Sequence, residues 1–529
     1  MTDRNSGRRR APALPGPTVS GNRRESLLPL LPAIILALLT LIRLVVAASS
    51  GLSPDEAYYW VWSRALAPGY LDAPPMVALW IRAGTAIAGP GTLGIRALAP
   101  LSALLGTGLL VAAAEDLVPG RQAGLVAAAL LNATVLFGVG AVTMTPDTPL
   151  LFFWTLALFA MGRLLATGEG RWWLLAGAAI GCAMLSKYTA LLLAIGVALW
   201  LVVVPAARPW LRRWQPWAAA ALSVAIFAPD LAWNAAHHWA SYIKQGGRTG
   251  VWHPADALRY LGELVGGQAG LATPLVFVLC VCGVWWAARR GLRGDPAAGL
   301  LALLTVPGAL VFLEHAVGGR VQANWPAVLY PAAAVAACAL RWRPWRSAAA
   351  IGFAMTALVY LQATAAPWHL PPKQGAVFAR LAGWPELGAA IDQARMATGA
   401  RFVASDEYGL ASELARTLPG FVPVVAAAPR WRLFALPSAA HVTEGQVGLL
   451  VQSVHRSGLP DAAPWASITR IGRLSRIRHG TVAEDYRLYR VVGAPAGGGY
   501  AVLLPRPDIV GQALTSIPDN AVNRARSSR

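Results

Sequence analysis

Acidic residues gather in one short aromatic stretch near the start of the chain. Asp55, Glu56 and Asp72 all fall within residues 52–76, a segment that prolines interrupt near both ends. Proline stiffens the backbone around these carboxylates, and a general base needs such a fixed position. A single acidic loop residue can also be no more than a solvated side chain. The gathering of several carboxylates among aromatic residues favours acid–base chemistry here.

A second acid and a lysine stand at the ends of later apolar segments. Asp147, in the sequence TPDTPLLFFW, follows Pro146 and stands where a helix is expected to begin. There it either caps the free amides of the helix or acts as a second acid that shapes the field around Asp55. Lys187, between two apolar runs, either extends to the membrane interface or binds the phosphate of a lipid.

Further cations and histidines occupy loops that are expected on the same side of the membrane. Arg320, with either Arg248 or Lys244, has flexible glycines nearby, and together these cations would make a clamp for a phosphate leaving group. His237 and His238 are adjacent, which is not a metal-ligand spacing. We expect this pair to contact the interface or an acceptor.

The sequence contains no motif for nucleotide binding or for a serine triad. A phosphate-cradling glycine loop, a Walker lysine and a Ser-His-Asp spacing are absent from it. The acids offer no fixed metal-ligand spacing either. We therefore expect no metal site, and a divalent cation held partly by water is the alternative.

The elements that must position these residues are those of a membrane protein. Hydrophobic residues make up 56% of the 529 residues and charged residues 13%, about half of the usual share. The net charge of +20 does not indicate nucleic acid as a partner, because the basic residues cluster in short loops between apolar segments. The cysteines lie inside apolar runs, so the sequence predicts neither disulfides nor a zinc site.

Apolar runs of spanning length recur along the chain and predict about eleven transmembrane helices. The first is too long for a signal peptide and is expected to stay as an anchor. If the N-terminus is cytoplasmic, the arginine-rich loops lie inside, as the positive-inside rule requires. The runs cover residues 27–48, 92–114, 121–141, 147–166, 172–187, 188–206, 215–235, 269–288, 297–313, 323–340 and 347–366.

The same alternation places the acidic and aromatic loops outside. Two amphipathic segments between residues 57 and 88 are too short to span and too apolar to lie free in water. We expect them, with a third at 255–268, to be helices at the outer membrane interface.

The chain changes character after Pro367. Residues 400–428 predict a strand, a helix and a strand, and the stretches 446–454 and 484–494 predict further strands. With an odd number of spans, this α/β domain lies outside. The expected parts are a cytoplasmic basic tail at 1–26, a transmembrane domain at 27–367, a periplasmic α/β domain at 368–504 and a disordered tail at 505–529.

An active site built from acids and cations on the outer face can act only on a substrate that is carried to that side of the membrane. ATP and nucleotide sugars are cytoplasmic, so a lipid-carried substrate fits an outside site better. The reaction that suits these residues begins when a carboxylate takes a proton from an acceptor. The acceptor then attacks an activated carbon, and a lipid phosphate departs against the cations.

Several stretches, in this order, resemble bacterial glycosyltransferase family 39 membrane proteins, relatives of protein O-mannosyltransferases and lipid A aminoarabinose transferases. The resemblance covers residues 27–370 and extends less specifically into the outer domain. It implies a GT-C fold, a polyprenyl-phosphate sugar donor and direct displacement with inversion at the anomeric carbon. The stretches are SPDEAYYWVWSRALAPGYLDAPPMVALWIRAGTAIAG, TPDTPLLFFW, WWLLAGAAIGCAMLSKYTALLL, DLAWNAAHHWASYIKQ, LRYLGELVGGQAGLATPL and ANWPAVLYPAAA.

The resemblance also implies roles for single residues. Asp55 matches the family's acidic residue in the first outer loop, which is taken as the catalytic base, and Asp147 matches the second acidic position. Lys187 falls where the family carries a lysine near the donor phosphate. We expect the donor phosphate to meet Lys187, Arg320 and Arg248, and the acceptor or donor pocket to include Glu56, Tyr59, Asp72, His237 and His238.

Two other classes of protein were weighed against an enzyme. A transporter or flippase of envelope lipids or glycans would show midplane charges and inverted repeats, which the sequence lacks. An assembly or receptor protein would not need so many spans. We therefore expect an inverting glycosyltransferase of the bacterial cytoplasmic membrane, with an envelope lipid, glycan or protein as acceptor and its site on the periplasmic side.

Overall fold

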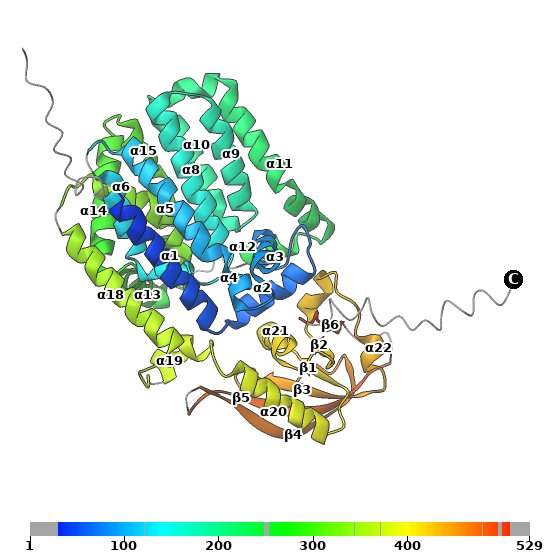
Figure 1. Cartoon of the computed structure of the whole chain (residues 1–529). Coiled ribbons are helices and arrows are strands. Elements are labelled where there is room, and N and C mark those ends of the chain that lie inside the picture. Colours follow the sequence, from blue (N-terminus) through cyan, green and yellow to red (C-terminus); the bar gives the residue numbers. More distant parts are fainter. Residues whose placement is uncertain are drawn as a thin grey trace, which may run out of the picture.

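The computed structural model describes residues 30–120, 122–247, 253–342, 344–370, 372–478, 480–495 and 500–507. The expected tail at 1–26 and most of the expected tail at 505–529 lie outside these residues. A bundle of helices forms the first part of the chain, and a smaller domain built on a β-sheet follows it (Figure 1). The expected fold class, a polytopic helical protein with a C-terminal α/β domain, is confirmed.

Seven helices in the described residues are long and apolar enough to cross a membrane. They are α1 (Leu31–Ser49), α4 with α5 (Thr92–Leu117), α8 (Asp147–Thr167), α11 (Trp214–Ala236), α14 (Pro274–Gly291), α15 with α16 (Pro296–Gly318) and α18 (Trp345–Thr364). Shorter apolar helices are α3 (Met76–Ala88), α6 (Ala123–Asn132), η1 with α10 (Tyr188–Val203) and η3 with α17 (Trp325–Cys338). The count of about eleven spans stays a prediction.

Small residues let the helices that carry the acids approach closely. Helix α9 (Arg171–Met184) packs between α8 and α11. A Cβ added at Gly177 on α9 would lie only 2.3 Å from the carbonyl oxygen of Ala219 on α11, and Gly181 meets Ser223 in a similar way. Such contacts are typical of membrane helices, where packing rather than the hydrophobic effect drives association. Helices α9 and α11 are therefore held in a fixed relation.

Short helices cover the end of the bundle that faces the C-terminal domain. They are α2 (Pro54–Arg64), α3, α12 (Ala240–Gly246) and α13 (Pro254–Leu271). Ser53 and Glu56 form a capping box that starts α2, with Pro54 in the first helical position. In Figure 1, α2, α3 and α12 lie between the bundle and the sheet domain. Helices α2, α3 and α13 fall on the segments that were expected at the outer interface, whereas α12 was not expected.

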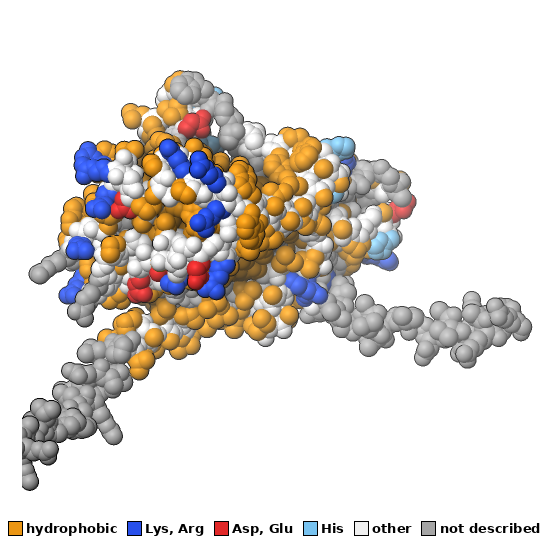
Figure 2. All heavy atoms as spheres, turned by 90° about the horizontal axis from the view of Figure 1, so that it is seen from above, with side chains coloured by type: hydrophobic (Ala, Val, Ile, Leu, Met, Phe, Trp, Pro, Cys, Tyr) orange, Lys and Arg blue, Asp and Glu red, His pale blue; other side chains and the backbone are white. Residues whose placement is uncertain are grey.

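The opposite end of the bundle carries the basic loops. The loops after α8, α10 and α14 reach this end, since these helices begin at the end that holds Asp147 and α13. They include Arg213 and Arg293, and Arg171 begins α9 directly after the first of them. Figure 2 looks down on this end and shows Lys and Arg side chains gathered among hydrophobic ones. The distribution is the one that the positive-inside pattern predicts.

Smaller helices in the bundle are α7 (Val135–Gly140) and η2 (Arg208–Arg212).

The C-terminal domain is built on a six-stranded sheet with the order β4-β5-β3-β1-β2-β6. Strand β1 runs parallel to β2 and β3, whereas β5 is antiparallel to β3 and β4, and β6 is antiparallel to β2. The strands are β1 (Phe402–Ser405), β2 (Val424–Ala426), β3 (Val447–Ser453), β4 (Trp465–Arg478), β5 (Thr481–Gly493) and β6 (Val502–Leu503). The helices are α19 (Pro372–Ala379), α20 (Trp384–Ala397), α21 (Tyr408–Thr417), η4 (Pro429–Leu433) and α22 (Ala440–Thr443).

The expected strand–helix–strand unit is present as β1, α21 and β2, and the two expected later strands are β3 and β5. Strands β4 and β6 were not expected. Strand β4 is rich in arginine, which hides its alternation of apolar and polar residues, and β6 has only two residues.

A shared hydrophobic core joins the C-terminal domain to the bundle. Tyr58 and Trp62 of α2 belong to the same buried cluster as Phe434, and their rings lie 6.0 and 6.2 Å from the Phe434 ring. Helix α21 packs on α2 so closely that a Cβ at Gly409 would lie 2.7 Å from the Cβ of Pro54. The C-terminal domain is thus built onto the short helices rather than attached by a linker alone.

Candidate active site

Asp55 stands at the junction of the bundle and the C-terminal domain. It lies in the first turn of α2, and its side chain is 38% exposed. Its Oδ1 accepts a hydrogen bond of 2.9 Å from the Tyr408 hydroxyl, and its Oδ2 lies 3.2 Å from Nη2 of Arg380. Burial and the charge of Asp55 raise the pKa of Tyr408, so this hydroxyl stays protonated and donates. The C-terminal domain therefore orients the carboxylate that α2 presents.

Glu56, the next residue, is fully buried and belongs to the framework of the site. Arg96 on α4 holds both of its oxygens, at 2.6 and 2.7 Å, and the Met144 amide donates to Oε1 at 3.0 Å. Burial alone raises the pKa of Glu56, but Arg96 and the amides outweigh it, and the pKa is lowered overall. Since Ser53 also donates to Oε2, each oxygen is engaged, and Glu56 ties α2 to α4 and to the start of α8.

Asp72 joins three segments that are far apart in the sequence. Its Oδ2 accepts a hydrogen bond of 2.8 Å from the Tyr58 hydroxyl and lies 3.2 Å from Nη1 of Arg430. Its Oδ1 pairs with Lys244 of α12. The Arg430 guanidinium also lies 4.2 Å from the centre of the Tyr408 ring. Asp72 thus connects the first outer loop, α12 and the C-terminal domain.

The charges of several acids affect the pKa of Tyr59. Burial raises its pKa well above the usual value, and the charges of Asp55, Asp72 and Asp147 raise it further, with Tyr408. A phenol that is kept neutral donates a hydrogen bond and does not act as a base. Asp55, Asp72 and Asp147 therefore all act electrostatically on one tyrosine, which the sequence alone could not show.

Asp147 and Lys187 form an ion pair at the ends of two bundle helices. Asp147 begins α8 and is largely buried, and its Oδ1 lies 2.7 Å from Nζ of Lys187, in the break between α9 and η1. Asn324, just before η3, donates to the other carboxylate oxygen at 2.5 Å. The carboxylate holds the ammonium group in place, and the ammonium keeps donors that an anion can use.

The segment that follows Asn324 forms one wall of an apolar groove. It has a volume of about 360 Å³ and is lined by α13, α14, α16 and the segment from η3 to α17. Pro326 and Leu329 of η3 belong to its wall, and Gln268 at its border bonds Tyr330 and the carbonyl of Ala323. The groove therefore runs between membrane helices, and its η3 wall is joined to Asp147 through Asn324.

A further buried acid, Asp230 on α11, was not expected from the sequence. The Tyr188 hydroxyl lies 3.3 Å from its Oδ2, and the Asn234 amide donates to the same oxygen at 3.2 Å. Tyr188 follows Lys187 directly, so this group supports the break that carries the lysine.

The remaining expected residues lie around these groups. Arg320 pairs with Glu263 of α13 at 2.8 Å, and its side chain is 71% exposed. His237 ends α11, stacked on Trp233 with ring centres 4.1 Å apart, and His238 is exposed next to it. Arg248 lies outside the described residues.

Sequence reasoning also missed the partners of the acids. Arg96 could have been noticed, because a lone arginine in an otherwise apolar run marks a structural or functional site. Tyr408, Arg380 and Arg430 gave no such signal. Tyr408 and Asp55 are 353 positions apart, and only the docking of α21 on α2 brings them together.

Among the described residues, no three His, Cys, Asp or Glu side chains form a group that could hold a metal ion. Instead, Asp55, Asp72 and Asp147 are each paired with a cationic side chain.

Comparison with known proteins agrees with this geometry. Residues 72–233 match the family described as dolichyl-phosphate-mannose-protein mannosyltransferase. The lipid A galacturonosyltransferase RgtD of Rhizobium johnstonii is 28% identical over 380 residues, which cover 69% of this chain and 77% of that protein. Both matches are to sugar transferases, and they give the transporter alternative no support.

Solved structures share the fold. ArnT from Cupriavidus metallidurans, solved with bound undecaprenyl phosphate, aligns with a TM-score of 0.57 at 16% identity, covering 87% of this chain and 98% of ArnT. Its apo structure gives a TM-score of 0.55 at 17% identity, with 89% and 98% covered. The resemblance found in the sequence motifs and the GT-C fold that it implies are confirmed.

Proposed function

We propose that this chain, a membrane glycosyltransferase of the GT-C superfamily, moves a sugar from a polyprenyl-phosphate donor to an acceptor of the cell envelope. One observation carries the proposal. Asn324, which precedes the η3 wall of an apolar groove between membrane helices, donates to the Asp147 carboxylate that pairs with Lys187. A lipid phosphate has the two parts that this arrangement would take, an anionic head for the lysine and a prenyl chain for the groove.

In the proposed reaction, Asp55 is the general base. It takes the proton of an acceptor hydroxyl, whose oxygen attacks the anomeric carbon of the donor sugar from the face opposite the phosphate. The bond from that carbon to the phosphate oxygen breaks, and its electron pair leaves with the phosphate. Lys187 stabilises the departing phosphate, and the configuration at the anomeric carbon is inverted.

The other polar residues support these steps. Asp147 and Asn324 hold Lys187 and its surroundings, and Arg320 stands beside the α13 wall of the groove through its pair with Glu263. Tyr408 and Arg380 fix the orientation of Asp55. Asp72, Tyr59 and His237 belong to the walls of the pocket in which the two substrates meet.

The acceptor that we propose is a glycolipid of the lipid A class. The relative RgtD is by its name a lipid A galacturonosyltransferase, and it matches 69% of this chain. We place the site on the periplasmic face of the cytoplasmic membrane. Support comes from the arginines that gather at the opposite end of the bundle, which the positive-inside rule assigns to the cytoplasm (Figure 2).

The test is a transfer assay with the purified full chain in lipid nanodiscs. A radiolabelled polyprenyl-phosphate sugar and lipid A are supplied, and the labelled product is identified by chromatography and mass spectrometry. We expect product from the polyprenyl-phosphate donor and none from a nucleotide sugar. Transfer from the nucleotide sugar, or movement of the donor across sealed vesicles without product, would contradict the proposal.

A further inference from the structure

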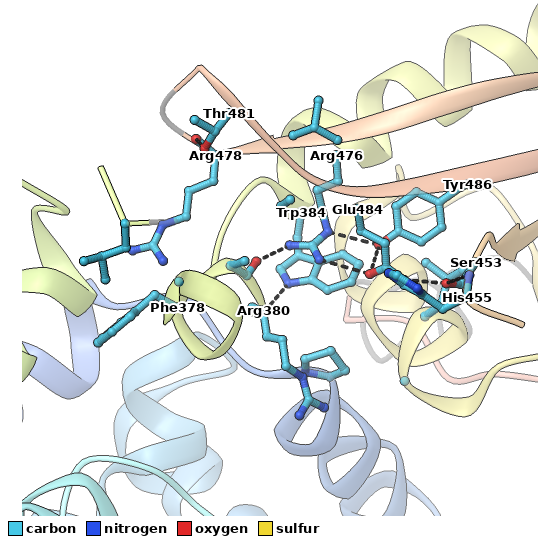
Figure 3. A pocket seen from close by; sticks show the side chains of 18 of the residues that line it. Phe378, Arg380, Trp384, Ser453, His455, Arg476, Arg478, Thr481, Glu484 and Tyr486 are labelled. Carbon is cyan, nitrogen blue, oxygen red and sulfur yellow. Dashed lines mark hydrogen bonds and ion pairs between the residues drawn. The ribbon is translucent and has the colours of Figure 1, made fainter. Parts of the chain in front are cut away.

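A cavity of about 790 Å³ lies between the C-terminal domain and the chain that connects it to the bundle. Its walls come from the residues that follow α18, from α19, from the start of α21 and from strands β3, β4 and β5 (Figure 3). Pro54, Arg380 and Tyr408 also line it. Because Arg380 and Tyr408 both bind the Asp55 carboxylate, the cavity adjoins the proposed base.

Two of the arginines in this cavity serve the fold. The guanidinium of Arg476 donates to the carbonyls of Ala379 and Ala382 and pairs with Glu484, and Figure 3 shows it in the centre of this network. Arg456 pairs with Asp406 at 3.3 Å. These contacts fasten the sheet to the connecting chain and engage both guanidinium groups.

The other two arginines, Arg478 and Arg380, have donors that the fold does not use. Arg478 is 9% exposed, and its Nη2 donates to the Gln362 carbonyl at 3.1 Å. Its Nε is buried and has no partner within the described residues. A buried donor without an acceptor is destabilising, so a ligand that supplied one would bind favourably. Arg380 is 53% exposed and uses Nη2 for Asp55.

Aromatic side chains complete the cavity. Trp384 and Phe378 form part of its wall, and Tyr486 of β5 lies beyond Glu484, on the side away from Phe378 (Figure 3). Trp368 and Leu370, which follow the outer end of α18, line it too and are 44% and 37% exposed. Tryptophan at the end of a membrane helix is typical of the level of lipid head groups. The cavity therefore combines cations and flat apolar surfaces with a wall at the membrane interface.

We propose that this cavity is the binding site for the phosphorylated sugar head group of the acceptor lipid. The phosphate is bound by Arg478 and Arg380, and a sugar ring lies against the aromatic wall. Arginine suits this task because its planar group binds phosphate through two parallel hydrogen bonds. The proposal rests on the proposed function, and it adds the place where the acceptor enters.

The two lipids would then reach Asp55 by separate routes. The apolar groove near Lys187 is lined by α13, α14, α16, η3 and α17, whereas the cavity is lined by the end of α18, by α19 and by the C-terminal domain. The two hollows share no lining residue. An acceptor in the cavity and a donor in the groove would therefore be bound together, as direct displacement requires.

Photo-crosslinking tests the place of binding. Phe378 is replaced by photoreactive benzoylphenylalanine, and the full chain is inserted into phosphatidylcholine vesicles that contain bisphosphorylated lipid A. We expect a lipid A adduct at this position. The same probe at Arg470, an exposed position on β4 that does not line the cavity, serves as the matched control and is expected to give none. Equal adducts at both positions, or none at Phe378, would overturn the site.

Affinity measurements test the chemistry. We expect Arg478→Gln to weaken lipid A binding by about 10- to 100-fold, as loss of a charged hydrogen bond does. Arg470→Gln should leave it unchanged. Because Arg478 is buried, Ala483→Trp provides a second variant, which keeps every arginine and reduces the volume of the cavity that Ala483 lines. It too should weaken lipid A binding.

Two comparisons distinguish failure of the proposed acceptor site from failure of the proposed function. Lipid A without phosphates should bind weakly to the wild type, and free inorganic phosphate should not compete, because the site takes the whole head group. Equal affinity for both forms of lipid A would overturn the proposal. Binding of polyprenyl phosphate is measured in parallel and should be the same in Arg478→Gln as in the wild type. If the wild type itself does not bind polyprenyl phosphate, the proposed function fails instead.

Discussion

Each acid of the site is held by a cation from a distant part of the chain. Arg380 binds Asp55, Lys244 and Arg430 bind Asp72, and Lys187 binds Asp147. The acids differ in exposure, since the Asp55 side chain is 38% exposed and the Asp147 side chain 12%. Asp55 is therefore more open than Asp147, as the role of base proposed for it requires, and Asp147 is suited to holding Lys187.

At this scale, Asp55→Asn should lower the transfer rate by about 100-fold or more, the usual contribution of a general base. The amide keeps the shape of the carboxylate and still accepts from Tyr408, so donor binding should persist. Asp256→Asn, which alters an exposed acid on α13, is the control and should transfer normally. The rate is measured with saturating donor in nanodiscs. An unchanged rate in Asp55→Asn would remove Asp55 from the mechanism.

Lys187→Ala should raise the KM for the donor by about 10-fold or more, because a charged hydrogen bond to phosphate is lost. Arg320→Ala is the matched comparison. Its side chain is 71% exposed, so water screens its charge, and we expect a change of about twofold. Both KM values are taken from initial rates at varied donor concentration. A larger effect from Arg320→Ala would move the phosphate site toward α13.

Among the elements, the contact of α21 with α2 has the greatest consequence for the site. Gly409 at the start of α21 lets Pro54 approach, and this contact sets Tyr408 against Asp55. Any larger side chain at position 409 must displace one helix from the other.

Gly409→Val should therefore reduce transfer and loosen the C-terminal domain. Overpacking of this kind costs about 1–3 kcal/mol. Gly472→Val on β4 is the control, since a Cβ there has nothing within 4 Å and valine suits a strand. Transfer rate and limited proteolysis of the C-terminal domain report the two effects. Normal transfer by Gly409→Val would show that the contact between α21 and α2 does not position Asp55.

Glu413, on the same helix, makes the stability of this contact depend on pH. Burial raises the pKa of its carboxyl to about 8, although Arg416 opposes the shift. Between the ordinary value of 4.5 and about 8, the folded protein binds this proton and the unfolded chain does not. The free energy of unfolding contributed by Glu413 therefore falls as pH rises through this range, and it is constant above it.

Glu413→Gln should remove that dependence. The amide is neutral at every pH. The variant should therefore have a higher apparent Tm than the wild type at about pH 8, and a similar apparent Tm at about pH 5. Thermal unfolding is followed in detergent at both pH values. Glu444→Gln, at an exposed position, controls for loss of charge and should unfold like the wild type. Parallel pH profiles for Glu413→Gln and the wild type would rule out this role.

For the molecule as a whole, the two ends of the bundle differ in chemistry. One end carries Asp55, Asp72 and Asp147, and Figure 1 shows the short helices and the C-terminal domain at this end. The other end carries the basic loops, and Figure 2 shows their Lys and Arg side chains. The positive-inside rule then gives the whole chain one orientation.

Cysteine labelling in intact cells checks this orientation. Ser457→Cys, exposed in the C-terminal domain, should react with a membrane-impermeant maleimide, and Thr167→Cys, exposed at the far end of α8, should react only after the membrane is opened. The native cysteines lie in helices of the bundle, and the unsubstituted protein is the background control. The reverse labelling pattern would place the site on the cytoplasmic face.

The sequence by itself determined the membrane class, the positions of the apolar helices and the motifs around Asp55, Asp147 and Lys187. Membrane helices and interfacial segments can be predicted from the local sequence, because the bilayer sets their length and the period of their apolar residues. The strand–helix–strand unit at β1, α21 and β2 was visible for the same reason, whereas β4 was hidden by its arginines.

Only the tertiary structure decided what surrounds the acids. Hydrogen bonds from Tyr408 to Asp55 and from Asn324 to Asp147 join residues 353 and 177 positions apart, and no local pattern records such contacts. The burial of Glu56 against Arg96 likewise follows from the packing of α2 on its neighbours. Side-chain pairing across elements depends on how whole surfaces fit together, which is why the C-terminal domain became part of the site only when the fold was known.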